Sequence, residues 1–310
     1  MNLSGVLVVD KPKGMTSHDV VDHLRRILGT RKIGHGGTLD PGADGVLLVC
    51  INKATKLVQF LNQYDKEYQA VIKLGVVTDT YDAEGKVLHV KENLEMGEDQ
   101  IRDAVSSFKG RIRQTVPLYS ALKFQGKPMY HYARSNVKVE PKRREVEIKN
   151  LEILDIKMPL VHLRINCSKG TYIRSLASDL GEKLGCGACL FSLRRTGVGP
   201  YQASEALSLE DISHIQTDGR IEEILLPIER IMSDFPSVVV EDSFSDRIQH
   251  GIPLKSSSVL SVEGDFEVNQ TISVKDKRKR IIAFGRALTS AKNFLDLNYD
   301  SRLFEYLRVI

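Results

Sequence analysis

A glycine-rich turn that leads directly into an apolar run limits the folds open to this chain more than any other feature. Residues 34–45 have the sequence GHGGTLDPGADG, and residues 46–50 have the sequence VLLVC. Glycine lets the backbone adopt positive φ and approach another molecule closely, whereas Pro41 fixes its own φ and pushes Asp40 toward an extended conformation. The turn therefore holds one carboxylate, that of Asp40, in a restricted conformation just before the start of a buried strand. Turn chemistry alone allows two interpretations of Asp40, a reactive group or an Asx-type cap of a backbone amide.

Hydrophobic patterning elsewhere predicts both strands and helices. Strands are expected at residues 5–12, 46–51, 68–75, 145–154 and 160–167, with 87–90 as the hairpin partner of 68–75. Helices are expected after Ser17 as N-cap, around residues 101–108, and at 172–184. The order has no regular βαβ rhythm, so we expect an α+β fold with a mixed, largely antiparallel sheet and flanking helices.

The last quarter of the chain has a different pattern. A Leu-Pro step at residues 226–227 and a Phe-Pro step at residues 235–236 indicate a boundary near residues 232–236. Short strands are expected beyond it, at residues 237–241, 259–262, 271–274 and 280–284. The sequence thus predicts two domains, residues 1–232 and a small β-rich domain at residues 233–310.

The basic residues are concentrated in two segments. The whole chain has 44 Lys and Arg against 40 Asp and Glu, a formal charge of only +4. Residues 109–149 contain eleven Lys or Arg against three Glu, and residues 275–286 contain six against one Asp. Such patches in a nearly neutral protein indicate a polyanion contacted at two places, or else two solvated charged faces.

The cysteines and the N-terminus exclude some classes of protein. Cys186 and Cys189 have the spacing of a metal-ligand pair, but no second pair follows, and a zinc site needs about four ligands. We expect reduced, structural cysteines and no bound metal; a zinc-binding regulatory module is the less favoured alternative. No signal-peptide layout and no membrane-length apolar run is present, so we expect a soluble, cytoplasmic protein.

A second segment, CSKGTYIRSLASDLG at residues 167–181, predicts a turn followed by a helix. Arg174 would lie in the first turn of that helix, at the edge of its buried stripe. A cation there opposes the helix dipole, so a carboxylate partner would explain it; the alternative is an ordinary surface arginine.

Aromatic side chains occur beside charged ones in two further segments. Tyr68 follows Asp65-Lys66-Glu67 at the start of a strand, where it could stack on an unpaired base or simply favour the strand. Asp82 lies in the turn at residues 78–85, whose spacing does not fit an EF-hand and which we expect to position nucleic acid. Residues 116–134 alternate aromatic and basic side chains, which suits phosphate tracking and base stacking.

Taken in order, these segments resemble the TruB-type tRNA pseudouridine synthases. The matching motifs are KPxGxTS from Lys11, HxGTLDPxAxG from His35, YSAxK from Tyr119, KGTYIR from Lys169 and LRRTxVG from Leu193. The resemblance implies the pseudouridine synthase fold, with a C-terminal domain that is PUA-like in position and strand pattern. The sequence departs from the family pattern at Gly36, where relatives usually have a larger polar residue.

The resemblance also implies roles for individual residues. Asp40 would be the catalytic residue, Arg174 would pair with it, and Tyr172 would lie beneath the target base. Tyr68 would stack on the extruded uracil, and we assign His35 and Asp82 to substrate binding. The insertion at about residues 109–149 would clamp the T arm of tRNA.

The implied activity is isomerisation of uridine 55 in the tRNA T loop to pseudouridine, by base flipping and an aspartate-dependent mechanism without cofactor or metal. We expect a monomer that needs no obligate protein partner. Two alternatives stay open: a guide-RNA-dependent ribosomal RNA pseudouridine synthase, and a tRNA-folding chaperone.

Overall fold

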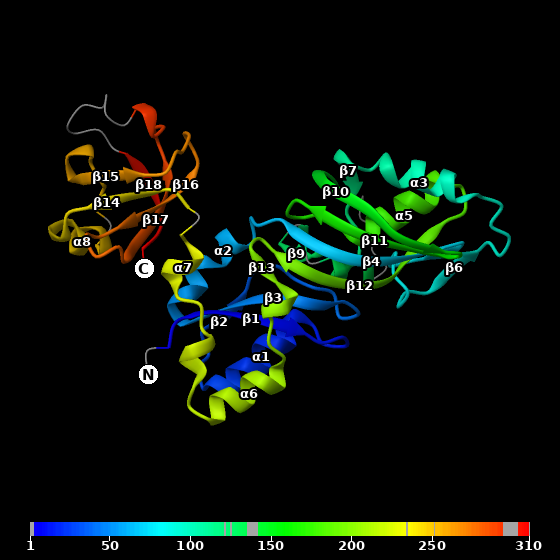
Figure 1. Cartoon of the computed structure of the whole chain (residues 1–310), viewed down its shortest axis with the longest axis horizontal. Coiled ribbons are helices and arrows are strands. Elements are labelled where there is room, and N and C mark those ends of the chain that lie inside the picture. The colour runs from blue at the N-terminus through cyan, green and yellow to red at the C-terminus, as the bar shows by residue number, and fades with distance from the viewer. Residues whose placement is uncertain are drawn as a thin grey trace.

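The fold comes from a computed structural model of the chain (Figure 1). It describes residues 3–120, 122–124, 126–134, 142–233, 235–250, 252–293 and 303–309. None of the helices in these ranges is long and apolar enough to cross a membrane.

Within the described residues, a nine-stranded sheet forms the larger part of the molecule. Its main path runs β1-β3-β12-β4-β11-β10-β7, while β2 pairs with β3 and β13 pairs with β12. The strands are β1 (Gly5–Lys11), β2 (Ile33–His35), β3 (Asp44–Ile51), β4 (Lys66–Leu74), β7 (Gly110–Thr115), β10 (Arg143–Lys157), β11 (Leu160–Cys167), β12 (Ala188–Val198) and β13 (Tyr201–Gln202). Strand β12 pairs in parallel with β3 and antiparallel with β4, so it joins the two halves of the sheet. The predicted mixed, largely antiparallel sheet is confirmed.

Each half of the sheet is covered by its own pair of helices (Figure 1). Helices α1 (Ser17–Leu28) and α6 (Leu209–Thr217) lie beside β1 and β3, and their apolar side chains form one buried cluster with those strands. Helices α3 (Glu98–Ser106) and α5 (Ile173–Lys183) pack with β4, β10 and β11 in another cluster. Helix α5 also contacts β12 and β4 in the middle of the sheet, and it carries Arg174 of the predicted site.

The start of α1 differs from the prediction by one residue. Thr16, not Ser17, is the N-cap, and a capping box joins it to Asp19. Ser17 is the first helical residue, and its hydroxyl is buried. Its hydroxyl is hydrogen-bonded to both backbone polar groups of Leu39, so it is not available to cap the helix.

The predicted hairpin partner of residues 68–75 was also wrong. Residues Val87–Val90 form β6, which pairs with β5 (Val76–Thr78) in a separate two-stranded sheet. Both edges of β4 are already occupied, by β11 and β12, and Gly75 turns the chain away at φ +80°.

A second sheet forms the C-terminal part. Its strand order is β15-β14-β16-β17-β18, and β14 pairs in parallel with β16. The elements are β14 (Ser237–Val240), α8 (Asp242–Gln249), β15 (Val259–Glu263), β16 (Thr271–Lys275), β17 (Ile281–Ala287) and β18 (Phe304–Val309). The β-rich character is as predicted; the division into residues 1–232 and 233–310 stays a prediction.

Aromatic side chains join the two parts. The ring of Phe60 lies 4.9 Å from that of Phe284 and 6.1 Å from that of Phe235, centroid to centroid. Phe60 belongs to α2 (Val58–Leu61) and Phe284 to β17. Helix α7 (Ile228–Ile231) contributes Ile228 and Ile231 to the same buried cluster.

The remaining described elements are short. They are η1 (Asn52–Leu57), β8 (Lys123–Phe124), β9 (Lys127–Pro128), α4 (Met129–Arg134), η2 (Ala203–Glu205), η3 (Ile221–Ile224) and η4 (Ser256–Ser258).

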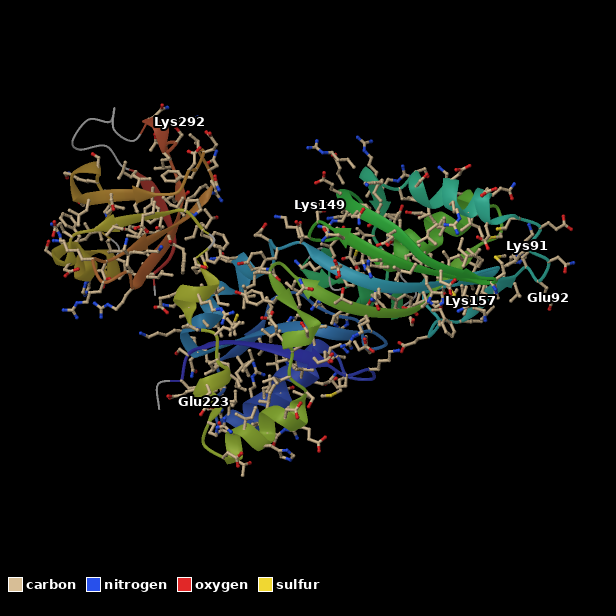
Figure 2. All side chains as sticks on the ribbon, viewed as in Figure 1. Lys91, Glu92, Lys149, Lys157, Glu223 and Lys292 are labelled. Carbon is tan, nitrogen blue, oxygen red and sulfur yellow. The ribbon has the colours of Figure 1, made fainter. Side chains whose placement is uncertain are left out.

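The described part of the first basic segment lies mainly on β7 and β10. Figure 2 shows Lys149 extending from β10. Its ammonium forms an ion pair with Asp65 at 2.5 Å. On the neighbouring strand, Arg111 and Arg113 lie opposite Glu147 and Glu145 in the β7–β10 register. Part of this positive charge is therefore offset by carboxylates on the same sheet.

Candidate active site

The turn around Asp40 is fixed by hydrogen bonds on both sides of the carboxylate. Before it, the Leu39 amide donates to the Ser17 hydroxyl at 2.8 Å, and that hydroxyl donates to the Leu39 carbonyl at 3.1 Å. After it, the Gly14 amide donates to the Pro41 carbonyl at 2.9 Å, and the Ala43 amide donates to the Asp40 carbonyl at 3.1 Å. The backbone is held while the Asp40 side chain stays 44% exposed. This combination suits a carboxylate that meets another molecule.

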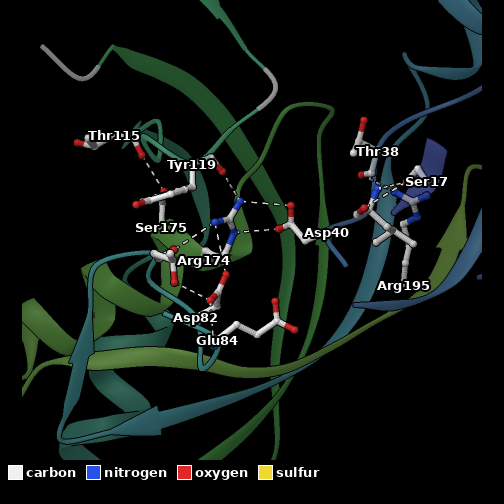
Figure 3. A network of polar contacts seen from close by, with 12 residues as sticks. Ser17, Thr38, Asp40, Asp82, Glu84, Thr115, Tyr119, Arg174, Ser175 and Arg195 are labelled. Atoms are coloured by element: carbon white, nitrogen blue, oxygen red, sulfur yellow. Dashed lines mark hydrogen bonds and ion pairs between the residues drawn. The ribbon is translucent and has the colours of Figure 1, made fainter. Parts of the chain in front are cut away.

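Arg174 holds the Asp40 carboxylate from the other side (Figure 3). Its Nε lies 2.9 Å from Oδ2 of Asp40, and its Nη2 donates to Oδ1 at 3.3 Å. The two residues are 134 positions apart in the chain. The structure thus brings together the two residues that the sequence predicted to be partners.

The arginine is buried, with its side chain only 6% exposed, and it needs several acceptors. Its guanidinium donates to the Thr80 carbonyl at 3.1 Å and to the Tyr119 carbonyl at 2.9 Å. A second carboxylate, that of Asp82, lies 3.4 Å from its Nη1. Two carboxylates therefore offset a cation that opposes the dipole at the start of α5.

Asp82 owes its position to a tight turn. Its Oδ1 accepts hydrogen bonds from the Thr80 hydroxyl at 2.6 Å and from the Glu84 amide at 3.2 Å. Tyr81, between Thr80 and Asp82, has a positive φ of 65°. Oδ2 is left to face Arg174, so the predicted substrate-binding residue is in the same network as Asp40.

Tyr172 lies at the N-cap of α5, next to this network. Its amide donates to the Gln114 side chain at 3.1 Å, and the Gln114 amide group donates back to the Tyr172 carbonyl at 3.2 Å. Gln114 is fully buried, which makes the pair a rigid support. The Arg144 guanidinium lies 5.9 Å from the centre of the half-buried Tyr172 ring.

Tyr68 lies on β4, directly opposite Arg195 of β12 in the sheet register. Its side chain is nearly buried, with the residue 8% exposed. Burial raises the pKa of the Tyr68 hydroxyl, whereas the neighbouring Arg195 guanidinium acts in the opposite direction. The structure brings Tyr68 to the glycine-rich turn through Arg195.

His35 ends β2, immediately before the glycine pair. Its pKa is lowered by burial and by the Arg195 charge. Its Nδ1 atom is buried and has no hydrogen-bond partner among the described residues. The imidazole is therefore neutral near pH 7, with one ring nitrogen left without a partner there.

The departure at Gly36 has a local explanation. A Cβ added at this position would lie 2.8 Å from Cβ of Leu61, too close for an undisturbed contact. The Gly36 amide nevertheless donates to the Leu48 carbonyl at 2.8 Å. Glycine at position 36 therefore avoids a clash with Leu61, and the turn keeps this backbone hydrogen bond.

Three buried cations near the turn were missed as functional candidates. They are Lys11, Lys66 and Arg195, and all three donate to backbone carbonyls. Burial, reinforced by Arg195, lowers the pKa of Lys66 to about 8, and burial also lowers the pKa of Lys11. The available signal was a basic residue at an inward-facing position of an apolar strand, as at Lys66 two positions before Tyr68.

Some predicted features fall partly outside the described residues. In the basic and aromatic segment 116–134, residues 121 and 125 are not described, and residues 135–141 of the insertion are not described either. Cys186 and Cys189 are buried and form no disulfide. In the described ranges, no group of three or more His, Cys, Asp or Glu side chains is arranged to hold a metal ion.

Three consecutive segments of the chain match family descriptions. Residues 25–173 match "TruB family pseudouridylate synthase (N terminal domain)". Residues 174–233 match "tRNA pseudouridylate synthase B C-terminal domain", and residues 236–301 match "PUA domain". The first boundary falls between Ile173 and Arg174, so the Asp40–Arg174 pair is formed across two matched segments.

Curated relatives cover most of the chain. A protein of Clostridium tetani named tRNA pseudouridine synthase B is 41% identical over 258 residues, which are 83% of this chain and 88% of the relative. A protein of Burkholderia mallei with the same name is 42% identical over 285 residues, or 92% of this chain and 93% of the relative.

Solved structures share the architecture. The crystal structure of a Cbf5-Nop10-Gar1 complex contains a chain that is 29% identical, with a TM-score of 0.79, and the match covers 98% of this chain and 84% of that one. A structure of an H/ACA RNP bound to a substrate RNA containing 2′-deoxyuridine gives 27% identity, a TM-score of 0.77 and the same coverages. The structural likeness therefore extends over both sheets.

Proposed function

Because this chain belongs to the TruB family of pseudouridylate synthases, we propose that it isomerises uridine 55 in the T loop of tRNA to pseudouridine. The family resemblance, predicted from the motifs, and the C-terminal PUA domain, predicted from its position and strand pattern, are confirmed. The relatives named tRNA pseudouridine synthase B support tRNA as the substrate. The observation that carries the proposal is the half-exposed Asp40 carboxylate, held by the buried guanidinium of Arg174.

The reaction breaks the bond between uracil N1 and ribose C1′ and forms a bond from C1′ to C5 of the same base, while C5 loses a proton and N1 gains one. It is an isomerisation, so the substrate supplies every atom of the product. The base must first leave its stack, because its reacting atoms are otherwise covered. Asp40 is the proposed catalytic residue, and Arg174 orients its carboxylate through two contacts.

Three residues are proposed to bind the extruded nucleotide directly, and a fourth, Asp82, indirectly. Tyr172, at the N-cap of α5, and Tyr68, on β4, are proposed to stack on the base, and base–aromatic stacking contributes about 1–3 kcal/mol per base. His35 offers the buried ring nitrogen that has no partner in the described structure. Asp82 acts through Arg174, whose second carboxylate contact it provides.

The basic surface of β7 and β10 is proposed to contact the phosphates of the T arm. Arg111 and Arg113 are exposed there, and the insertion at about residues 109–149 includes both. Contacts to phosphates position the RNA but do not identify its sequence. The extruded base would then be recognised in the site itself.

We test the proposal with a T-arm hairpin and purified protein, detecting pseudouridine by its carbodiimide adduct. Asp40→Asn should reduce turnover to below about one thousandth of the wild-type rate while the RNA still binds, since the amide cannot replace the charged group. Asp44→Asn is the matched control from the same turn. Its carboxylate contacts Arg194 at 3.2 Å and Lys13 at 3.8 Å, away from Arg174, so turnover should stay close to wild type. Turnover close to the wild-type rate in the Asp40→Asn protein would exclude Asp40 as the catalytic residue.

The same assay separates the two alternatives. The structural likeness to the H/ACA RNP favours a guide-RNA-dependent ribosomal RNA enzyme as the second candidate. The curated tRNA enzymes are more similar in sequence, at 41% and 42% identity against 27%. We propose a cytoplasmic monomer that needs no protein partner, so the purified chain should modify the hairpin without guide RNA. A tRNA-folding chaperone without catalysis would refold tRNA but leave no carbodiimide adduct.

A further inference from the structure

Arg195 is the largest of the fully buried side chains in the described structure, and the proposed mechanism gives it no role. The residue is 1% exposed. Its guanidinium donates to three backbone carbonyls, those of Val46 at 2.6 Å, Gly37 at 3.2 Å and Thr38 at 3.4 Å. No carboxylate of the described residues forms an ion pair with it. A buried cation without a counter-ion is costly, so its position calls for an explanation beyond packing.

The register of β12 places Arg195 between two parts of the site. Across the antiparallel pair, its Cα lies opposite that of Tyr68 in β4. Across the parallel pair, it lies opposite Gly45 in β3, the strand that follows the Asp40 turn. One residue therefore borders both the strand that carries the stacking ring and the strand that follows the carboxylate.

Both the backbone and the side chain of Arg195 lie close to the turn. A Cβ added at Gly45 would lie 2.2 Å from the Arg195 carbonyl oxygen, so the two strands approach through a glycine. Gly37 has a φ of +99°, and its carbonyl and that of Thr38, three and two residues before Asp40, accept hydrogen bonds from the guanidinium. In Figure 3 the Asp40 carboxylate points toward Arg174 and away from Arg195. The turn is thus held between two arginines, one at its carboxylate and one at its backbone.

We propose that Arg195 is a positioning residue, which fixes the Asp40 turn and the Tyr68 ring relative to each other so that both reach the same extruded uracil. This inference rests on the proposed function. A guanidinium suits the task because its donors form a rigid planar fork spread over three nitrogens, whereas a lysine ammonium has all its donors on one freely rotating atom.

The first test is Arg195→Lys, which keeps the charge and removes the fork. On the T-arm hairpin, kcat should fall about 10- to 100-fold with little change in KM, since a small misplacement of reacting groups slows the chemistry more than binding. Arg194→Lys is the matched control. Arg194 is the neighbouring residue of β12, contacts Asp10 at 2.8 Å and Asp44 at 3.2 Å, and has a 39% exposed side chain. Its substitution should leave kcat near wild type.

A double-mutant cycle separates positioning from general stability. Tyr68→Phe leaves the three carbonyl contacts of Arg195 in place and removes the hydroxyl beside it. If Arg195 acts through Tyr68, the loss in kcat from Arg195→Lys should be smaller in the Tyr68→Phe protein than in the wild type. Losses that simply multiply, an unchanged kcat for Arg195→Lys, or an equal loss for Arg194→Lys would each overturn the proposal.

Two further outcomes are informative. If the Arg195→Lys protein does not fold, the Tyr68→Phe protein tests the proposal by itself. The proposal then expects Tyr68→Phe to lower kcat at unchanged KM, and an unchanged kcat would refute the proposal. If the wild-type protein forms no pseudouridine, the proposed function itself fails. Wild-type activity that is lost in Asp40→Asn but kept in Arg195→Lys would overturn only the role of Arg195.

Discussion

At the scale of single residues, the site is built from cations that are buried against backbone carbonyls. Lys66 donates to the carbonyls of Asn62 at 2.9 Å and Tyr64 at 2.5 Å, and Lys11 donates to that of Met15 at 2.6 Å. Carbonyl oxygens are weaker partners for a cation than carboxylates, so these charges reduce stability. They leave the half-exposed Asp40 carboxylate in a positively charged surrounding.

Lys66 makes the stability of the protein depend on alkaline pH. Its pKa is lowered from 10.5 to about 8, chiefly by burial. Below pH 8 the Lys66 amine is charged in both the folded and the unfolded protein, so the folded protein bears the full cost of burying the charge. Between pH 8 and 10.5 the unfolded protein binds more protons than the folded protein, so the unfolding free energy rises with pH. Relative to Lys66→Met, the wild type should therefore gain about 3 kcal/mol of unfolding free energy from pH 7 to pH 10.5.

Urea unfolding at several pH values measures this difference. Lys53→Met, which removes an exposed lysine of η1, serves as the control and should show a constant difference from wild type. A constant difference for Lys66→Met as well would show that Lys66 does not have the lowered pKa.

The pairing of Asp40 with Arg174 was predicted, whereas the burial of Arg195 was not. The first follows from a cation in the first turn of α5 that needs a carboxylate, together with the family motif. The second depends on register. Arg194 and Arg195 are adjacent and point to opposite faces of β12, and only the pairing of β12 with β3 and β4 decides which of them is buried.

At the scale of elements, helix α1 has a second function besides covering the sheet. Its N-cap Thr16 is exposed and closes a capping box, whereas Ser17 is buried and holds both backbone groups of Leu39. One end of the helix is therefore fastened to the residue before Asp40. The roles of these two neighbouring hydroxyls can be separated by mutation.

We expect Ser17→Ala to lower the unfolding free energy by about 2 kcal/mol, since it leaves a buried amide and a buried carbonyl without partners. It should also lower kcat about tenfold, because the Asp40 turn loses its support. Thr16→Ala should cost about 1 kcal/mol as an ordinary cap, with kcat unchanged. Chemical unfolding and the T-arm assay measure both quantities. Equal effects of the two substitutions on kcat would contradict the assignment.

Sequence patterns identified local elements better than their partners. The strands at β1, β3, β4, β10 and β11 and the helix α5 were predicted close to their observed bounds. Strand β12 was not, because two arginines and a glycine interrupt its apolar pattern near Leu193. Its central place comes from long-range pairing with β3 and β4, which no local pattern contains. The same reason explains the wrong partner chosen for residues 87–90.

At the scale of the whole molecule, an aromatic contact joins the two sheets. Phe284 is fully buried and lies in one cluster with Phe60 from the larger part, although it belongs to the C-terminal sheet. Ile282, two positions earlier on β17, packs instead inside the C-terminal sheet. These two residues allow the joint and the C-terminal core to be weakened separately.

Phe284→Ala should destabilise the joint by about 3 kcal/mol and divide thermal unfolding into two transitions, one for each sheet. Ile282→Ala removes buried apolar surface from the C-terminal core and should shift the transition without separating the joint. Scanning calorimetry of the two variants tests this. A single transition for Phe284→Ala at the wild-type midpoint would show that the sheets are held together by other contacts.

The place of β12 between β3 and β4 has a consequence for how the chain is synthesised. Until residue 198 has left the ribosome, β4 has no neighbour on one edge, β3 is paired on the corresponding edge only with β2 at residues 49–51, and the half-sheets that carry Asp40 and Tyr68 are not joined. The unpaired N–H and C=O groups of an exposed strand edge can form hydrogen bonds with strands of other chains. The nascent protein therefore passes through a period in which about two thirds of its length is made but its sheet is incomplete, and protection from aggregation matters most then.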